Sequence, residues 1–392
     1  MRELLDLTFR WIHVIAAIMW IGNSLLYNWL DRSLRPSRDP RDVEGDAWLI
    51  HSGGFYHVEK RRRLDELPRP LHWFKWQAYT TWLSGAALLV VVYYFGGRAL
   101  LLGPGATMSD GAAIATSAGI LLGSWLAYEA LWRSPLSGAP GLTSGLSLAL
   151  VAAVGFALTQ VFSGRAAFLH VGAVLGTLMA ANVATAIMPA QRSLVRSVEE
   201  GGQPDPRLSM AAKERSVHNN YMAFPVIVLM LSSHFPGLYG HRWNWLVLAV
   251  LVAGGAAVRH ALNLRFQSPR WLAALAASLA GTLAALYVLG ALFAGARGSV
   301  PGTADGGPVT FEAVRHVIAK RCTPCHSVSP AIAEFGASPA GVAFDTDEQI
   351  RALAERIRER AVVTETMPPG NATHLTAAER DVLRRWTGAV AR

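Results

Sequence analysis

Cysteine and charged residues are both scarce in this chain, and each scarcity excludes a class of protein. Only 2 of the 392 residues are cysteines, so a zinc site would need two further ligands at comparable spacing, which the sequence does not offer. Charged residues make up 16% of the chain and hydrophobic residues 52%, and the mean hydropathy is +0.28. This composition is too apolar for an ordinary soluble enzyme. We therefore expect an integral membrane protein that is long enough for two domains.

Both cysteines stand in the run Cys322-Thr323-Pro324-Cys325-His326. In such a run two thiols add to the vinyl groups of a haem, and the adjacent imidazole ligates the iron. A redox motif of the thioredoxin type would need a surrounding βαβ pattern and would not demand the histidine. We predict one covalently held haem c, and hence a redox function.

Met367 is the predicted sixth ligand of that iron. It begins the stretch Met367-Pro368-Pro369-Gly370-Asn371, and a thioether in a stiff Pro-Pro loop is typical of a His/Met cytochrome c. The alternatives are that Met367 is an ordinary apolar loop residue and that His316 or His374 is the ligand.

The residues from Phe311 to Arg392 resemble a small class I cytochrome c, in which Phe311 and Trp386 would pack where the first and last helices cross. Residues 295–308 are rich in glycine and are expected to form a flexible tether. A tether of this length would keep the haem near the membrane domain, so that electrons pass within one chain. The predicted division is a membrane domain at 1–294, the linker at 295–308 and a cytochrome domain at 309–392.

Apolar segments long enough to span a bilayer occur eight times. They lie near 9–30, 72–96, 111–133, 141–162, 165–189, 219–238, 243–264 and 271–294. The first is too long for a removable signal peptide and has no clear cleavage site. The predicted fold class is therefore all-α, with an eight-helix membrane bundle followed by the cytochrome.

Basic residues indicate the orientation of these segments. The net charge of +9 could suggest nucleic-acid binding, but the basic residues fall in loops between apolar runs, so no nucleic-acid partner is expected. The first loop and the loop after the fifth segment are predicted to face the cytoplasm because they hold most of the lysines and arginines: Arg32, Arg35, Arg38, Arg41, Lys60, Arg61, Arg62, Arg63 and Arg69, then Arg192, Arg196, Arg207, Lys213 and Arg215. Both chain ends then lie outside. Haem is attached to cytochromes c on the outer face of bacterial membranes, which agrees with this orientation and predicts a periplasmic cytochrome.

The first cytoplasmic loop, 31–71, is long enough to carry structure of its own. Its aromatic residues, histidines and basic run favour an interfacial segment that anchors at the membrane surface. The alternative is a lid over a cytoplasmic opening that attracts an anion.

Ionisable residues within apolar segments are costly and therefore indicate function. An outer set, His13, His170 and His234, is predicted to lie on the cytochrome's side, where it could ligate a b-type haem or another redox centre. A lone histidine in a helix is also often a hydrogen-bonded packing residue.

An inner set suits a planar anionic substrate that enters from the cytoplasm. Its best catalytic candidates are His72, His218, Asn219, Asn220 and Glu129, joined by Asn28, Lys75, Asn182, Arg259 and Asn263. Glu129 could instead form an ordinary i,i+4 ion pair with Arg133.

Three strings resemble the bacterial membrane-bound urate oxidase family: the opening 1–14, the run Met19-Trp20-Ile21-Gly22-Asn23-Ser24, and Glu214-Arg215-Ser216-Val217-His218-Asn219-Asn220-Tyr221. Members of that family join an eight-helix membrane domain to a C-terminal cytochrome c, and the resemblance covers essentially the whole chain.

The resemblance implies oxidation of urate to 5-hydroxyisourate in the bacterial inner membrane. Electrons would pass to the cytochrome and then to a respiratory acceptor such as a terminal oxidase. One alternative is a b-haem protein that carries electrons from quinol to its own cytochrome c without substrate chemistry. Another is a transporter or sensor with a redox-reporting tail.

Overall fold

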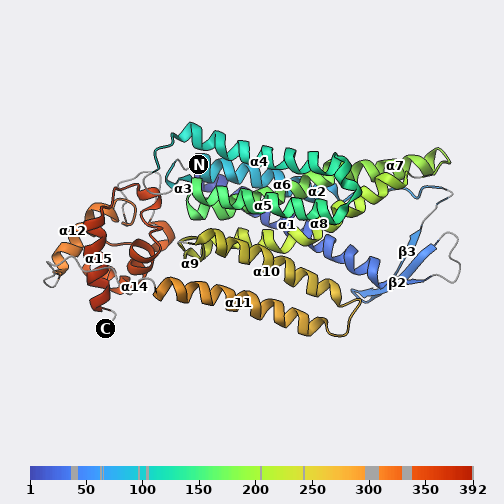
Figure 1. Cartoon of the computed structure of the whole chain (residues 1–392). Coiled ribbons are helices and arrows are strands. Elements are labelled where there is room, and N and C mark those ends of the chain that lie inside the picture. The colour runs from blue at the N-terminus through green and yellow to red at the C-terminus, as the bar shows by residue number, and fades with distance from the viewer. Residues whose placement is uncertain are drawn as a thin grey trace.

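A helical bundle makes up most of the molecule, with a small helical domain at one end and a β-sheet at the other (Figure 1). This computed structural model describes residues 1–392 except 37–42, 62–63, 65, 96–97, 103–105, 204, 242, 296–308, 329–337 and 391–392. The predicted linker at 295–308 therefore lies almost entirely outside the described residues. Four of the predicted cytoplasmic loop charges also lie outside them: Arg38, Arg41, Arg62 and Arg63.

The bundle is formed by long helices joined by short turns. Its helical elements are α1 (Arg2–Ser33), α2 (Lys75–Leu88), the π-helix η1 (Leu89–Tyr94), α3 (Arg98–Leu101), α4 (Asp110–Arg133), η2 (Pro135–Gly138), α5 (Pro140–Val161), α6 (Gly164–Asn182), the π-helix η3 (Val183–Ile187), α7 (Met188–Glu199), α8 (Pro206–Leu231), η4 (Ser232–His234), α9 (Pro236–Tyr239), α10 (Asn244–Leu264) and α11 (Trp271–Gly295).

Six helices in the described part of the chain are long and apolar enough to cross a membrane: Arg2–Ser33, Asp110–Arg133, Pro140–Val161, Gly164–Glu199, Asn244–Leu264 and Trp271–Leu292. They correspond to six of the eight predicted segments. The segment predicted at 72–96 is helical from Lys75 to Tyr94, but a π-helix interrupts it. The segment predicted at 219–238 lies in α8, which begins earlier, at Pro206, and ends at Leu231. Helix α8 is long enough to cross a membrane, but because its first half is charged it is not apolar enough to belong to these six helices.

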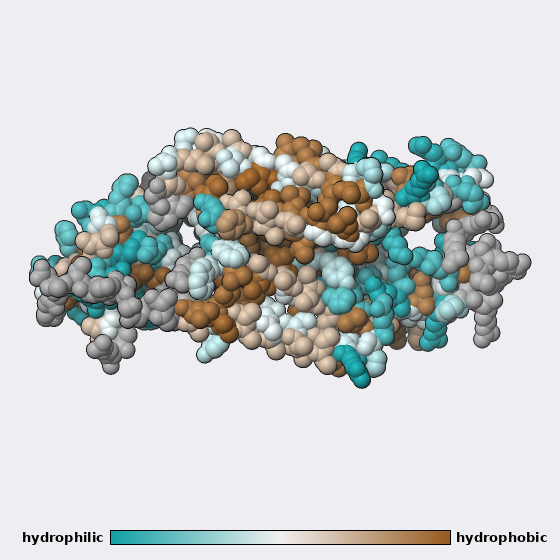
Figure 2. Space-filling view, viewed as in Figure 1, coloured by the Kyte–Doolittle hydropathy of each residue, from teal (hydrophilic) through white to brown (hydrophobic). Residues whose placement is uncertain are grey.

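On the face seen in Figure 2, the surface of the bundle is mostly apolar along its middle and more polar toward both ends of the molecule. Large side chains point outward from the first and last helices of the bundle, with Trp11 69% exposed and Leu283 66% exposed. An outward apolar band of this kind is what the bilayer favours, because lipid is as apolar as the side chains themselves.

A three-stranded antiparallel sheet occupies the loop after α1, so the all-α prediction is wrong for this segment. Its strands are β1 (Arg35–Pro36), β2 (Val43–His51) and β3 (Gly54–Arg61). Ser52 and Gly53 form the turn with φ of 50° and 77°, the left-handed pair that a tight hairpin requires. The Trp48 ring stacks on that of His57 across the strands, with centroids 4.5 Å apart. The aromatic and histidine residues of this loop thus stabilise a hairpin.

Helix α6 is the centre of the bundle and packs against α2, α4, α5 and α8. Its Phe168 and Val171 are almost fully buried, beside Leu158 of α5 and Leu229 of α8. This core fixes the relative positions of the helices that carry the polar residues described below.

The C-terminal domain has a separate core. Its helices are α12 (Phe311–Arg321), η6 (Pro339–Gly341), α13 (Asp347–Ala352), α14 (Ala354–Ile357), the π-helix η7 (Arg358–Val363), η8 (Pro369–Asn371) and α15 (Ala377–Val390). The rings of Phe311 and Trp386 lie 5.8 Å apart, and α12 contacts α15, so the predicted packing of the first and last helices is confirmed.

The N-terminus lies at the same end of the bundle as the C-terminal domain, and the β-sheet lies at the opposite end (Figure 1). This arrangement agrees with the prediction that both chain ends are on one side of the membrane. Which side that is stays a prediction from the loop charges.

Close packing of α8 against α10 depends on Gly255. A Cβ at this position would lie 2.8 Å from the backbone nitrogen of Pro225, so the helices would have to separate. We expect Gly255→Ala to lower the stability of the purified protein by about 1–3 kcal/mol, measured by unfolding in detergent. Gly281→Ala on α11 is the matched control, because a Cβ there meets no atom within 4 Å. Equal stabilities of the two variants would contradict the packing argument.

Candidate functional site

Polar side chains gather in two clusters within the half of the bundle away from the C-terminal domain. The first, here called the Tyr128 network, contains Tyr128, Glu129, Asn182, Arg215, His218 and Asn219. The second, called the Arg259 cluster, contains Asn220, Arg259 and Asn263. The two clusters are contributed by α4, α6, α8 and α10.

The Tyr128 network is held together by amide and hydroxyl groups. Tyr128 Oη lies 2.6 Å from His218 Nδ1. Asn182 Nδ2 donates to Tyr128 Oη at 3.3 Å and to Asn219 Oδ1 at 2.9 Å. Asn219 Nδ2 donates in turn to the carbonyl of Met179 at 3.0 Å. These bonds join α4, α6 and α8 at one level.

Arg215 provides the positive charge of the Tyr128 network. Its Nη1 donates to Asn182 Oδ1 at 2.9 Å and its Nη2 to Glu129 Oε2 at 3.0 Å, while its guanidinium lies 4.7 Å from the centre of the Tyr128 ring. Glu129 also accepts from Arg133 at 2.8 Å. The i,i+4 ion pair expected as the alternative is therefore present, but the buried partner of Glu129 is Arg215.

Arg215 is the residue that sequence reasoning misplaced. The distribution of basic residues predicts that Arg215 lies in a cytoplasmic loop, whereas it lies in α8 and is 5% exposed. The spacing of Arg215, His218 and Asn219 at i, i+3 and i+4 places the three side chains on one face of a helix, and this signal could have identified it.

His218 lies at the edge of the Tyr128 network. Its ring centre is 4.5 Å from that of Trp132, and its Nε2 lies 3.4 Å from Ser144 Oγ. Since Tyr128 holds the other ring nitrogen, the imidazole is fixed in orientation. A group held this way can accept or donate a proton at a defined atom.

The Arg259 cluster is arranged differently, because two of its atoms have no partner. Arg259 Nε and Asn263 Nδ2 both donate to Asn220 Oδ1, at 3.0 Å and 2.9 Å. Arg259 is 4% exposed and Asn263 is 6% exposed. Within the described part of the chain, Arg259 Nη2 and Asn263 Oδ1 are buried and make no hydrogen bond.

The predicted catalytic residues therefore separate. His218, Asn219 and Glu129 belong to the Tyr128 network, whereas Asn220 faces the Arg259 cluster. His72 is exposed in the segment before α2 and joins neither cluster.

The outer histidines have separate surroundings. His13 Nδ1 lies 2.9 Å from the carbonyl of Thr81. His170 is fully buried, with Nε2 at 2.7 Å from Ser117 Oγ and Nδ1 at 2.7 Å from the carbonyl of Ala166. His234 is exposed at the end of α8, against the carbonyl of Leu231. Among the described residues no group of three or more His, Cys, Asp or Glu side chains is arranged to hold a metal ion, and a redox site at these histidines stays a prediction.

The Cys322–His326 run in the C-terminal domain forms a helical turn after α12. The backbone N–H of Cys325 and that of His326 both donate to the carbonyl of Cys322, at 3.1 Å and 2.9 Å. His326 Nδ1 lies 3.0 Å from the carbonyl of Val342. Such a bond fixes the ring and leaves Nε2 free to bind a metal. The two thiols and this imidazole could hold a haem.

Burial, with a further contribution from Cys325, raises the pKa of the Cys322 thiol to about 12. Enzymes that exchange thiols and disulfides need a thiol of lowered pKa. The environment of Cys322 is therefore unlike that of a thioredoxin-type site.

Met367 lies in a loop that the backbone holds in place. Its N–H donates to the carbonyl of Arg360 at 3.0 Å, and the following Pro368 is buried. His374, one of the two alternative ligands, is exposed.

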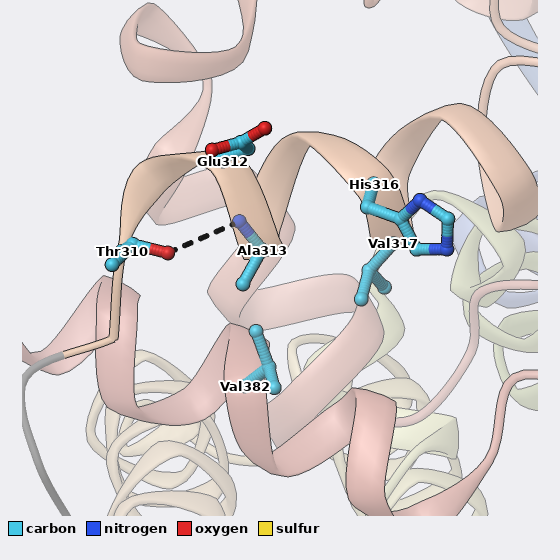
Figure 3. A pocket seen from close by; sticks show the side chains of 6 residues that line it. All are labelled: Thr310, Glu312, Ala313, His316, Val317 and Val382. Atoms are coloured by element: carbon cyan, nitrogen blue, oxygen red, sulfur yellow. Dashed lines mark hydrogen bonds between the residues drawn. The ribbon is translucent and has the colours of Figure 1, made fainter.

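His316, the other alternative, lines an open hollow with Thr310, Glu312, Ala313, Val317 and Val382 (Figure 3). That hollow contains neither cysteine of the chain. Met367 is half-buried, and its role as a haem ligand stays a prediction.

Arg321 and Glu379 join the two ends of the C-terminal domain. Arg321 Nε and Nη2 donate to the Glu379 carboxylate at 2.9–3.0 Å, and Nη1 donates to the carbonyl of Thr373 at 2.6 Å. This fork of hydrogen bonds ties the helix before the cysteines to the start of α15.

Residues 1–290 match the model of a family described as urate oxidase N-terminal. The match covers well over half of the chain, so the chain belongs to this family. No curated protein and no solved structure matches it. Membership supports an oxidoreductase that acts on urate.

Removing the carboxylate of Glu129 would leave the guanidinium of Arg215 buried without its counter-charge. We expect Glu129→Gln to reduce the stability of the protein by about 3–5 kcal/mol, measured by unfolding in detergent. Arg133→Gln is the control, because that side chain is 68% exposed and such pairs contribute at most about 1 kcal/mol. A Glu129→Gln variant no less stable than the control would show that the network does not depend on this ion pair.

The Arg321–Glu379 pair predicts an acid-sensitive domain. Burial alone would raise the pKa of Glu379, but hydrogen bonds from Arg321 and Thr376 outweigh it and lower the pKa from 4.5 to about 2. A lowered pKa contributes stability that is fully present above about pH 4.5 and lost as the pH falls toward 2.

Glu379→Gln should therefore be less stable than the natural protein by about 1–3 kcal/mol at pH 6, with a smaller difference at pH 3, measured by calorimetry. Glu355→Gln, which changes an exposed ion pair, should show neither effect. A difference that does not shrink at pH 3 would contradict the assignment.

Proposed function

We propose that this member of the urate oxidase N-terminal family is a membrane-bound urate oxidase that passes electrons to a haem c held by its own C-terminal domain. The family match supports the substrate class. The six membrane-length helices support the setting in a bilayer. The count of eight spanning segments, which adds α2 with η1 and the apolar half of α8 to these six, forms part of the proposal.

The residues of the C-terminal domain fit the proposed haem. Cys322 and Cys325 would bind it covalently, and His326, through its free Nε2, and Met367 would ligate its iron. The bound haem would accept one electron at a time. The protein's own contribution is to fix the imidazole against Val342 and to hold the Met367 loop.

Contact between the two halves of the chain is the observation that carries the proposal. Helix η8, which begins two residues after Met367, contacts α3 of the membrane domain. The Arg360 side chain lies near Tyr239, at the end of α9, and the carbonyl of Arg360 accepts the N–H of Met367. The Met367 loop thus lies on the side of the C-terminal domain that faces the bundle, which supports electron transfer within one chain.

The proposed reaction balances as urate plus water giving 5-hydroxyisourate, two protons and two electrons. Oxidation leaves an electrophilic carbon that water attacks, so a proton acceptor assists both steps. His218, which is oriented by Tyr128 and lies close to Ser144, is the candidate for that acceptor. Because one haem takes one electron, the two electrons must leave in successive steps or through a second centre, for which His13, His170 and His234 are the candidates, with a b-type haem as one form.

The proposed location is the bacterial inner membrane, with the N-terminus and the cytochrome on the periplasmic side. A respiratory acceptor such as a terminal oxidase would reoxidise the haem there.

Anaerobic mixing with urate tests this function directly. The purified oxidised protein should show the absorption bands of reduced haem c when urate is added without oxygen. The expected stoichiometry is two haem equivalents reduced for each urate consumed. Absence of reduction would overturn the proposed function. Reduction by a quinol, but not by urate, would instead favour an electron-transfer protein without substrate chemistry.

Two variants test the parts separately in the same assay. Replacing Cys322 and Cys325 with Ala should abolish covalent haem while the membrane domain still inserts, and persistent haem staining would contradict the attachment site. His218→Ala should slow reduction by urate by about 10²-fold or more without changing the spectrum of the haem. Unchanged reduction would remove His218 from the site.

A further inference from the structure

Two polar clusters of similar composition lie in the same half of the bundle, and they differ in one respect. In the Tyr128 network the buried guanidinium of Arg215 is paired with Glu129. In the Arg259 cluster, among the described residues, no carboxylate forms an ion pair with the buried guanidinium of Arg259. A buried charge without a counter-charge is costly, and the cost is several kcal/mol in proteins. The Arg259 cluster therefore lacks a group that would balance the charge of its guanidinium.

The missing component must satisfy both a donor and an acceptor. Arg259 Nη2 offers an unused N–H group, and Asn263 Oδ1 offers an unused pair of electrons. Arg259 and Asn263 both donate a hydrogen bond to the same oxygen, Asn220 Oδ1, Arg259 through Nε and Asn263 through Nδ2. The unpaired atoms are thus close to one point but do not bond to each other.

These requirements select the chemistry of the ligand. A carboxylate or the phosphodiester of a lipid headgroup offers only acceptors and would be repelled by Asn263 Oδ1. A ring that carries a carbonyl or enolate oxygen beside an N–H group offers both an acceptor for Arg259 and a donor for Asn263. An anionic ring adds the negative charge that the guanidinium lacks, and urate is a flat monoanion of this kind.

We propose that Asn220, Arg259 and Asn263 form the binding site for the urate anion, with Arg259 donating to a carbonyl or enolate oxygen on the ring and Asn263 accepting from the adjacent ring N–H. This inference rests on the proposed function, because urate is the substrate assigned there. It separates binding from the Tyr128 network, which lies next to it through the adjacent residues Asn219 and Asn220 of α8. The ring of Phe224, 5.6 Å from the guanidinium, closes one side of Arg259.

Binding can be measured apart from turnover. The full-length haem-loaded protein is first reduced with dithionite, so that urate cannot be oxidised, and urate is then titrated by calorimetry. Arg259→Gln and Asn263→Leu should each weaken urate binding at least tenfold. Arg265→Gln is the matched control: it removes an exposed cation directly after the last residue of α10 and should leave the affinity unchanged.

Asn263→Asp keeps the test decisive if Arg259→Gln does not fold. The new carboxylate would give Arg259 an internal partner and occupy its free donor. This variant should lose urate binding at least tenfold while its unfolding temperature stays equal to or rises above that of the natural protein. Unchanged affinity of Asn263→Asp would overturn the site.

Competition distinguishes the possible anions. Inorganic phosphate at millimolar concentration and nanodiscs rich in anionic lipid should leave urate affinity unchanged. Competition by either, together with unchanged binding by Asn263→Leu, would show a phosphate or headgroup site and overturn the assignment.

The outcomes also separate this site from the proposed function. Urate that binds in an Arg259-dependent way but does not reduce the haem would leave the site standing and overturn the electron transfer. Reduction of the haem by urate in Arg259→Gln, with unchanged KM, would leave the function standing and overturn the site.

Discussion

The buried ion pair between Arg215 and Glu129 is the interaction on which the polar interior of this bundle depends. A guanidinium in an apolar interior must be paired in charge and in hydrogen bonds, or its burial destabilises the fold. Arg215 meets this requirement by bonding to Glu129 of α4 and Asn182 of α6. These bonds fix the level at which α8 meets both helices. Asn220, which follows this face of α8 directly, is thereby presented to α10.

The contrast with Arg259 follows from the same requirement. Both guanidinium groups are buried and both touch asparagine side chains, but within the described residues only Arg215 forms an ion pair with a carboxylate. A fully paired network gives rigidity, whereas an unpaired donor and acceptor give affinity for whatever supplies the complement. The Tyr128 network therefore serves as a support with a histidine at its edge, and the Arg259 cluster is the part of the interior with capacity left for a ligand.

Sequence patterns predicted the helical elements well because the bilayer imposes a long apolar run on each helix that spans it. The sequence predictions are wrong in two places, the loop after α1 and the start of α8, where two sequence signals conflict. The loop after α1 is predicted to anchor at the interface within an all-α fold, but the Trp48–His57 stack and the Ser52–Gly53 turn stabilise a β-hairpin there. The predicted start of the sixth segment, residue 219, lies well after the true start of α8 at Pro206. The reason is that the first half of α8 is charged, and its buried Arg215 has the sequence signature of a loop cation.

The candidate site shows the same limit. Loop charge and helix depth placed His218, Asn219 and Asn220 on one level, but only the helical faces decide which neighbour each one meets. Two adjacent asparagines point about 100° apart on a helix, and so Asn219 bonds to Asn182 whereas Asn220 bonds to Arg259. The Cys322–His326 run needed no such information, because all its members lie within one turn.

Separation of the Arg259 cluster from the C-terminal domain sets a final constraint on the electron path. Asn220 and the end of α8 at Leu231 are eleven residues apart, which is about 16 Å of helix, and Tyr239 and Arg360 lie beyond that end. Under the proposed function, electrons released at the inner cluster would therefore need a carrier on the C-terminal domain's side of the bundle. His170, near the start of α6, contacts the rings of Tyr93 and Phe162 and lies on that side, and for this reason it is the outer histidine that best suits the proposed second centre.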